Sequence, residues 1–214
     1  LAGDNSTFIV DRSTLLLLNQ KNDDSQFVEL FNGYVRSNYG FALKPRSRKS
    51  EFQKGIFLFP NIDATRFPSG SYEIRVGKDN LVLAASDDAG KFYALQTLFQ
   101  LFRHEGKDIS IPAVRIKDSP RFSYRGMHLD VSRHFQPVEF IKKFIDQMAQ
   151  YKFNYFHWHL TDDQGWRIEI KKYPKLTEVG STRPETMLER NFAPYKGDGI
   201  PHGGFYTQEQ IKDV

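Results

Sequence analysis

Polar side chains gather directly after two short apolar stretches in the C-terminal half of the sequence. They are Asp130, Arg133 and His134 after the first stretch, and His159, Asp162, Asp163 and Gln164 after the second. If the two stretches are parallel strands, these side chains meet at the carboxyl edge of a sheet, where α/β proteins bind their ligands. The sequence therefore predicts a ligand-binding edge that combines carboxylates, imidazoles and one guanidinium group.

Arg133 is the only Lys or Arg in this group. Its planar fork can hold two neighbouring acceptors at once, such as a pair of adjacent sugar hydroxyls, and a carboxylate beside it would fix its direction. A structural ion pair with a nearby Asp explains the same residue types equally well. Spacing alone leaves the binding interpretation and the structural interpretation open.

His157 and His159 are two residues apart, so on a strand their rings point to the same face. Such a pair can bind one metal ion, and Asp162 or Asp163 would then be a further ligand or a base in a metal-dependent barrel hydrolase. The alternative is packing inside a barrel with both ring nitrogens satisfied. The sequence shows no second cluster of His or carboxylate residues, and we expect that no metal is used.

The elements that must position these residues are a strand, a helix and a second strand. Residues 124–130 and 154–160 are short and apolar-rich, as strands are. Pro137 suits the first position of the helix between them. The residues predicted for the buried side of that helix are Phe140, Ile141, Phe144, Ile145 and Met148. A βαβ unit of this kind has parallel strands and a right-handed crossover.

A long loop rich in Gly and Pro follows the second strand. After it, Thr207 and Gln210 have the spacing of a helix cap, in which the Thr side chain and the Gln side chain bond to each other's backbone N–H groups. The sequence therefore predicts that residues 207–214 begin another helix.

The N-terminal half has a different pattern, in which short strands alternate with two helices. The predicted strands are residues 7–10, 14–18, 55–59, 72–76 and 81–85. One helix begins at Ser25 and stops at Gly40, and the other covers residues 89–104. Two helices on one face of a small sheet form an α+β arrangement. The pattern changes near Asp118, which predicts two domains, residues 1–118 and 119–214.

The composition is that of a globular protein, because 26% of the 214 residues are charged, 39% are hydrophobic and 14% are aromatic. The net charge of +4 comes from Lys and Arg scattered among Asp and Glu, so we expect no nucleic-acid partner. The absence of Cys excludes a disulfide, a thiolate metal site and a Cys nucleophile. No apolar run approaches membrane-spanning length. Leu1 instead of Met indicates a processed or engineered start.

Several ordered motifs resemble glycoside hydrolase family 20, the β-N-acetylhexosaminidases. They are Arg-Gly-Met-His-Leu-Asp-Val-Ser-Arg-His-Phe at 125–135, Tyr-Lys-Phe-Asn at 151–154, His-Trp-His-Leu-Thr-Asp-Asp-Gln-Gly-Trp-Arg at 157–167, Tyr-Pro-Lys-Leu at 173–176 and Gly-Gly-Phe-Tyr-Thr at 203–207. The run Gly-Lys-Phe-Tyr-Ala-Leu-Gln-Thr-Leu at 90–98 is similar to the non-catalytic α+β domain that precedes the barrel in many members. The resemblance implies an α+β domain followed by the beginning of a (β/α)₈ TIM barrel, truncated after about two βα units.

For the full-length parent, the resemblance implies exo-hydrolysis of terminal non-reducing N-acetylhexosamine residues from glycans or chitooligosaccharides, with retention at the anomeric carbon. The nucleophile is the substrate's own 2-acetamido oxygen, a known exception to the scheme with two protein carboxylates. No cofactor is implied, and the family suggests a secreted, periplasmic or lysosomal location. The family's general-acid Glu and the Asp before it lie in a Gly-Gly-Asp-Glu motif that this sequence lacks. We therefore expect the chain to be a fragment that is inactive alone.

Two positions carry the family's functional residues. The family's Arg that holds the O3 and O4 hydroxyls of the terminal sugar matches Arg133. The carboxylate that acts through a His on the general acid matches Asp162, with that His expected beyond Val214. Asp130, His159 and Asp163 also match the pattern, without an assigned role. A barrel without its acid, acting as a non-catalytic glycan-binding module, is the remaining alternative to an enzyme.

Overall fold

The structure is a computed structural model that describes residues 6–18, 24–47, 55–59, 67–188 and 194–214. The chain forms two compact units, Leu1–Ser123 and Tyr124–Val214. Each unit has a hydrophobic core of its own, because the two clusters of buried apolar side chains share no residue. No helix among the described residues has both the length and the apolar character needed to cross a membrane.

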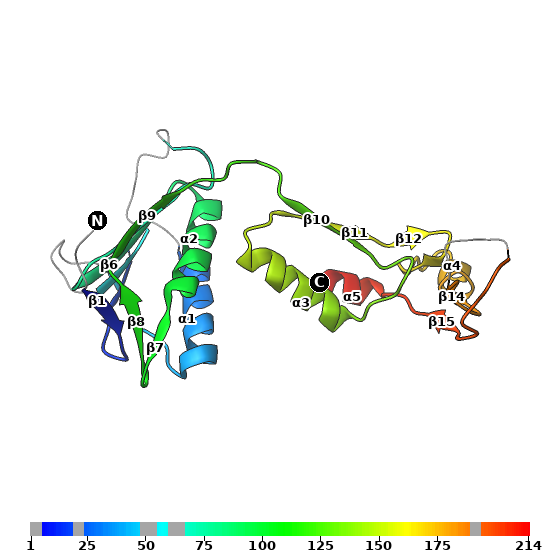
Figure 1. Ribbon diagram of the computed structural model, residues 1–214, viewed down its shortest axis with the longest axis horizontal. Helices are drawn as coiled ribbons and strands as arrows, with labels where there is room; N and C mark the ends of the chain where they lie inside the picture. Colours follow the sequence, from blue (N-terminus) through cyan, green and yellow to red (C-terminus); the bar gives the residue numbers. More distant parts are fainter. Residues whose placement is uncertain (1–5, 19–23, 48–54, 60–66, 189–193) are drawn as a thin grey trace. The chain divides into compact units, whose positions relative to one another are not determined.

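The main feature of the first unit is a six-stranded sheet with the order β3-β2-β4-β6-β5-β9 (Figure 1). Its strands are β2 (Leu16–Leu18), β3 (Pro45–Ser47), β4 (Gly55–Leu58), β5 (Tyr72–Val76), β6 (Asn80–Ala85) and β9 (Val114–Asp118). The pairs β2–β3, β2–β4 and β4–β6 are parallel, whereas β5 runs antiparallel to both β6 and β9. The sheet is therefore mixed.

A second, smaller sheet in this unit has the order β1-β8-β7 and is antiparallel throughout. Its strands are β1 (Thr7–Val10), β7 (Arg103–Glu105) and β8 (Asp108–Pro112). Strands β7 and β8 form a hairpin whose turn contains Gly106 at a φ of 61°. Glycine adopts this left-handed conformation at little cost, which explains why the chain can reverse there.

Two helices, α1 (Ser25–Tyr39) and α2 (Asp88–Leu101), lie on the same side of the six-stranded sheet (Figure 1). The side chains of Phe27, Phe31 and Val35 repeat every four residues along α1 and are buried in the core. Gly40 ends α1 in the left-handed conformation, with a φ of 75°. Helix α2 begins at an N-cap in which the Asp87 side chain accepts a hydrogen bond from the backbone N–H of Gly90 at 2.8 Å.

The structure confirms the predicted α+β arrangement of this unit and corrects several of its elements. The helix predicted for residues 89–104 ends at Leu101, because Phe102 has an extended backbone and the next residues pair as β7. The strand predicted for residues 14–18 begins only at Leu16, because Thr14 closes a turn with Asp11. Strands β3, β7, β8 and β9 were not predicted.

The second unit is built around a parallel pair of strands, β10 (Gly126–Asp130) and β11 (Tyr155–His159), which are connected by helix α3 (Val138–Gln150). This is the βαβ unit predicted from the sequence. His128 lies opposite His157 and Asp130 lies opposite His159 in the register. These four side chains share one face of the pair, because side chains on a strand alternate between its two faces.

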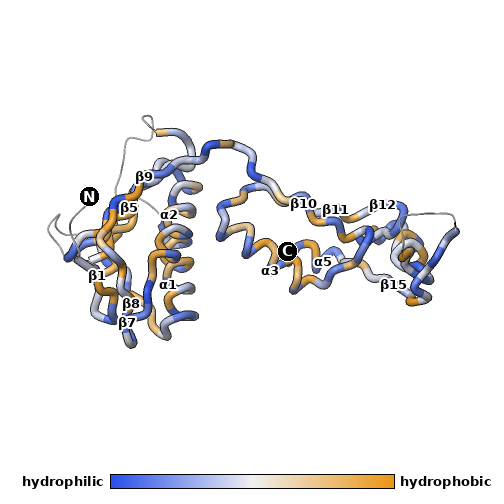
Figure 2. Tube along the Cα trace, in the orientation of Figure 1, coloured by the Kyte–Doolittle hydropathy of each residue, from blue (hydrophilic) through white to orange (hydrophobic). Residues whose placement is uncertain are grey.

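Helix α3 differs from its prediction in two respects. Pro137 is the N-cap and not the first helical residue, since its ψ of 158° is extended. Phe140 is exposed, whereas Ile141 and Met148 of the same predicted set are buried. The buried face follows the spacing 138, 141, 145 and 148, and Phe140 lies about 100° away from Ile141 around the helix. Hydrophobic and hydrophilic segments accordingly alternate along α3 in Figure 2.

Shorter elements complete the second unit. They are β12 (Thr161–Asp162), β13 (Gly165–Trp166), α4 (Lys175–Glu178), β14 (Thr182–Arg183), β15 (His202–Gly203) and α5 (Gln208–Asp213). The predicted capping box at the start of α5 is confirmed, since Thr207 and Gln210 exchange both of its hydrogen bonds. The described residues of this unit contain one parallel strand pair and no closed barrel.

Candidate functional site

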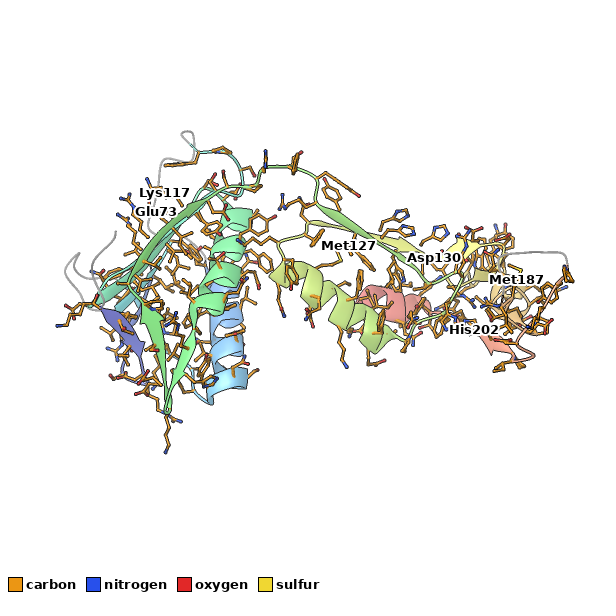
Figure 3. All side chains as sticks on the ribbon, in the orientation of Figure 1. Glu73, Lys117, Met127, Asp130, Met187 and His202 are labelled. Carbon is orange, nitrogen blue, oxygen red and sulfur yellow. The ribbon has the colours of Figure 1, made fainter. Side chains whose placement is uncertain are left out.

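Four side chains predicted from the sequence meet at the carboxyl ends of β10 and β11. They are Asp130, Arg133, His159 and Asp162, which we call the Arg133 cluster. The Arg133 Nη1 atom lies 3.1 Å from Asp130 Oδ2 and 2.5 Å from Asp162 Oδ2. Asp130, labelled in Figure 3, is the last residue of β10, and Asp162 ends β12, so two strand ends supply the carboxylates.

Asp162 is the centre of the hydrogen bonds in the Arg133 cluster. Its Oδ2 atom accepts a hydrogen bond from His159 Nε2 at 2.9 Å as well as pairing with Arg133, and its Oδ1 atom accepts one from the backbone N–H of Asp163 at 2.9 Å. The N–H of Asp163, the hydrogen bond from His159 and the charge of Arg133 together lower the pKa of Asp162 to about 2. Asp162 is therefore ionised at neutral pH.

Asp130 holds Arg133 from the other side. Its Oδ1 atom accepts the backbone N–H of Arg133 at 3.0 Å, while its Oδ2 atom faces the guanidinium group. Partial burial raises the pKa of Asp130, but the hydrogen bond from the Arg133 backbone and the charge of the guanidinium group lower it more, so that the net shift is downward. Two ionised carboxylates thus fix one end of the Arg133 fork.

The other side of the Arg133 fork is open. The contacts of the guanidinium group with Asp130, Asp162 and His159 all involve Nη1, which lies 3.1 Å from His159 Nε2. Among the residues that the structure describes, none pairs with Nη2 or Nε, and the side chain is 51% exposed. The ion pair proposed from the sequence is therefore present, and the same arrangement leaves donors directed away from the carboxylates. A fork held in this way can bind adjacent hydroxyl groups of a ligand.

One ring nitrogen of His157 and one of His159 face different partners. His157 Nδ1 lies 3.1 Å from His128 Nδ1, whereas His159 Nε2 faces Asp162 and Arg133. The guanidinium group of Arg133 thus lies close to His159 Nε2. In the described ranges, no group of three or more His, Cys, Asp or Glu side chains is arranged to hold a metal ion.

The other polar residues of the predicted edge lie around the Arg133 cluster. His134 points elsewhere and stacks on His202, with ring centroids 4.1 Å apart. Asp163 contributes its backbone N–H to Asp162, and the backbone oxygen of Gln164 accepts a hydrogen bond from Arg183 at 3.2 Å. The cluster is therefore smaller than the set of polar residues visible in the sequence.

Arg167 is a structural part of the site that the sequence did not reveal. Its side chain is fully buried and donates hydrogen bonds to four backbone oxygens: Nε to Val131 at 3.0 Å, Nη2 to Ser132 at 2.8 Å, and Nη1 to Ser181 at 2.5 Å and to Gly204 at 3.1 Å. Burial lowers its pKa from the ordinary value. Arg167 thus connects three separate backbone segments, one of which, Val131–Ser132, directly precedes Arg133.

The exposed, carboxylate-held Arg133 thus lies at the carboxyl ends of parallel strands, the edge where α/β proteins bind their ligands. The family described as "Glycosyl hydrolase family 20, catalytic domain" matches residues 122–214, and "Glycosyl hydrolase family 20, domain 2" matches residues 1–119. The chain belongs to glycosyl hydrolase family 20, as its motifs predicted.

Curated relatives carry names that agree with this family. The chain is 49% identical over 146 residues to a beta-hexosaminidase of Vibrio furnissii, covering 68% of this chain and 23% of the relative. It is 51% identical over 172 residues to a beta-hexosaminidase of Porphyromonas gingivalis, covering 77% of this chain and 21% of the relative. The chain therefore spans less than a quarter of the length of these two relatives.

Solved structures of family members have the same fold over this region. A GH20 exo β-N-acetylglucosaminidase from Vibrio harveyi in complex with N-acetylglucosamine matches with a TM-score of 0.77 and 33% identity, covering 98% of this chain and 32% of that one. The β-N-acetylhexosaminidase of Bacteroides fragilis matches with a TM-score of 0.76 and 33% identity, covering 98% of this chain and 39% of that one.

Proposed function

We propose that this chain is part of a β-N-acetylhexosaminidase that removes terminal non-reducing N-acetylhexosamine residues from glycans or chitooligosaccharides. The observation that carries the proposal is Arg133, whose Nη1 atom is fixed by Asp130 and Asp162 while the rest of the fork stays open. In this role, Arg133 binds two adjacent hydroxyls of the terminal sugar ring. The names of the relatives, and the N-acetylglucosamine bound in the Vibrio harveyi structure, support this substrate class.

In the same proposal, residues 1–118 form a non-catalytic α+β domain and residues 119–214 begin a catalytic (β/α)₈ barrel. The parallel pair β10–β11 with its connecting helix α3 has the architecture of a first βα unit followed by the second strand. The Arg133 cluster lies at the carboxyl ends of these strands, which is the edge where barrel enzymes place their active sites. The family match to residues 122–214 supports this division.

The proposed mechanism retains the configuration of the anomeric carbon. The 2-acetamido oxygen of the substrate attacks that carbon, as in the substrate-assisted glycosidases. Asp162 would support the general acid through a His that lies outside residues 1–214. An ionised Asp162, with its pKa of about 2, is suited to orient such a His and to raise its proton affinity. Because residues 1–214 lack the Gly-Gly-Asp-Glu motif, we expect no turnover from them alone.

The test of the sugar clamp is Arg133→Lys in the full-length enzyme. Lys keeps the charge but loses the planar fork, so kcat/KM on a terminal N-acetylglucosaminide should fall. The corresponding loss of transition-state stabilisation should be about 1.5 to 3 kcal/mol for each charged hydrogen bond lost. Arg115→Lys is the matched control, since Arg115 also pairs with a carboxylate, Glu73 at 2.7 Å, and is 48% exposed. Normal folding of Arg133→Lys with near-native kcat/KM would show that Arg133 does not bind the sugar.

Asp162→Asn should affect a different step. Removing the negative charge changes the proton affinity of the general acid, so kcat should fall and one limb of the pH profile should move. A plain folding defect would instead lower thermal stability and soluble yield in proportion to activity. An unchanged pH profile together with an unchanged kcat would remove Asp162 from the proton-transfer chain.

A further inference from the structure

The backbone that follows Arg133, at Phe135 and Gln136, is hydrogen-bonded to a second segment, residues 202–206. The backbone N–H of Phe135 donates a hydrogen bond to His202 Nε2 at 2.9 Å. The hydroxyl of Tyr206 donates one to the backbone oxygen of Gln136 at 2.5 Å. Both bonds involve the backbone within three residues of Arg133, so the position of that backbone depends on residues 202–206.

Close packing reinforces these two bonds. The ring of Phe135 lies directly against the backbone of Gly204, where a Cβ atom would come within 2.5 Å of the Phe135 Cδ1 atom. The rings of Phe135 and Tyr206 are 4.9 Å apart between centroids. Arg167 bonds to Gly204 as well as to Val131. The two segments are therefore joined on both sides of Phe135.

The bond at Phe135 requires one protonation state of His202. A backbone N–H can only donate, so His202 Nε2 must be the acceptor and cannot carry a proton. The neutral ring with its proton on Nδ1 meets this condition, whereas the doubly protonated ring does not. His202 lies on β15, as Figure 3 shows, and is paired in register with Arg183 of β14.

The groups around His202 favour its neutral form. Burial lowers the pKa of His202 first, and the neighbouring His134, Arg183 and Arg167 lower it further, while Asp198 raises it. His134 stacks on the ring from the segment that follows β10, Arg183 belongs to the paired strand, and Arg167 reaches the adjacent Gly204. A proton on His202 would thus add a third positive charge near two guanidinium groups.

We propose that His202 is a positioning residue for Arg133, and that its neutral imidazole holds the Phe135 backbone so that the Arg133 fork faces the sugar. Protonation of His202 removes the acceptor and releases this part of the segment. The inference rests on the proposed sugar-binding role of Arg133 for its kinetic consequence only, because the hydrogen bond itself is independent of the reaction. His202 acts through the Phe135 backbone and not by touching the substrate.

The expected kinetic effect is on substrate binding. Arg133 would hold ring hydroxyls away from the bond that breaks, so a misplaced fork raises KM more than it lowers kcat. Loss of one neutral hydrogen bond corresponds to a change of about threefold to tenfold. In the wild-type enzyme, KM should rise as the pH falls through the pKa of His202, which lies below the ordinary value of about 6.5.

Two variants of the full-length enzyme test the proposal. In His202→Gln, the side chain supplies an acceptor that does not titrate, so KM should stay near the wild-type value at neutral pH and should not rise on acidification. In His202→Leu, the acceptor is absent, so KM should be raised about threefold to tenfold at every pH, with kcat within about twofold of wild type. His104→Gln is the control, since His104 is an exposed residue of the first unit whose ring lies 4.4 Å from that of Tyr39 between centroids.

Hydrogen exchange at the Phe135 amide gives a readout that does not need activity. Protection of a peptide that contains this amide should be lost in His202→Leu at neutral pH and kept in His202→Gln. Equal pH dependence of KM in the wild type and in His202→Gln, or unchanged protection in His202→Leu, would overturn the proposal. If Arg133→Lys leaves activity intact, the sugar-binding role fails, and the exchange result still decides whether His202 holds the segment.

Discussion

The two units of this chain are stabilised in different ways. In the first unit, a large cluster of buried apolar side chains fills the space between the six-stranded sheet and helices α1 and α2. In the second unit, the apolar cluster is small, and the fully buried Arg167 connects three backbone segments through hydrogen bonds. Apolar burial is thus the main source of stability in the first unit, whereas hydrogen bonds of Arg167 add to a small apolar core near the Arg133 cluster in the second.

This difference agrees with the separate roles proposed for the two units. Apolar burial is not directional and tolerates small changes of position, so it stabilises a unit without fixing any one side chain in space. Hydrogen bonds from a buried guanidinium group fix both distance and angle. The sugar-binding role proposed for Arg133 requires that accuracy, since the fork would have to match two acceptors. Substitutions should therefore change stability alone in the first unit, and substrate binding as well in the second.

The largest expected effect on stability is in the first unit, at Phe31. Its ring is fully buried and lies 6.3 Å from the rings of both Phe99 and Phe102, measured between centroids. Phe31→Ala should cost about 3–5 kcal/mol because it leaves a cavity in the core. Denaturant unfolding measures the cost, and Phe122→Ala, at a position that is 66% exposed, is the control. A loss below about 1 kcal/mol would contradict the apolar account of this unit.

The next effect concerns Gly204 in the second unit. Gly204 has a φ of 143°, and its added Cβ would meet the ring of Phe135. Gly204→Ala should therefore destabilise the enzyme by about 1–3 kcal/mol and also raise KM, because the segment that carries Arg133 moves. Gly199→Ala is the matched control, since Gly199 has a φ of 68° but no atom within 4 Å of the added Cβ. A change in KM with Gly199→Ala as large as that with Gly204→Ala would refute the packing explanation.

Much of this arrangement could be predicted from the sequence. The strand pair β10–β11 and the polar residues at its carboxyl ends follow from short apolar runs and parallel-strand geometry. An ion pair of Arg133 with a nearby Asp was one of two interpretations that the sequence left open, and the structure shows such pairs with Asp130 and Asp162. The role of Arg167 could not be predicted, because its partners are backbone oxygens that any residue provides. The end of α2 was misplaced because Phe102 continues the apolar spacing although its backbone is extended.

The contact between His134 and His202 also could not be predicted from the sequence. The sequence places His134 beside Arg133, but only the fold brings His202, far along the chain, against it. A periodic pattern predicts which side chains share a face of one helix or strand. The contact between His134 and His202 joins a loop to strand β15, so such a pattern does not predict it. The roles of Arg133 and Asp162 in catalysis remain predictions, supported by their geometry.

A smaller effect is expected at the N-cap of α2. Asp87 accepts hydrogen bonds from Gly90 and Gly70, and also from the hydroxyl of Ser69 at 2.6 Å. Burial raises the pKa of Asp87, but the Ser69 hydroxyl and the two amides lower it more, so the folded pKa lies below the ordinary value. The ionised form is thus favoured by folding. Its contribution is full above the unfolded pKa of about 3.9 and is lost as the pH falls through the folded pKa.

Asp87→Ala should therefore cost about 0.5–2 kcal/mol at neutral pH, and less in acid. Asp87→Asn keeps a capping oxygen and should lose most of the pH dependence. Unfolding curves from acid to neutral pH distinguish the variants, and kcat/KM per folded molecule should be unchanged in both. A cost for Asp87→Ala that is the same at every pH would show that the ionised carboxylate contributes nothing beyond the cap.

The smallest expected effect is that of a chelator on the full-length enzyme, which should be none. His157 faces His128, and His159 faces Asp162 with the guanidinium group of Arg133 at 3.1 Å. A divalent cation bound at His159 Nε2 would have to displace this positive group and break its ion pair with Asp162. We therefore expect unchanged kcat/KM after dialysis against a strong chelator, with a zinc hydrolase treated in parallel as the control. Activity that is lost on dialysis and restored by added metal would show that His157 and His159 serve a metal site, and the account of Arg133 as a free sugar clamp would then have to be replaced.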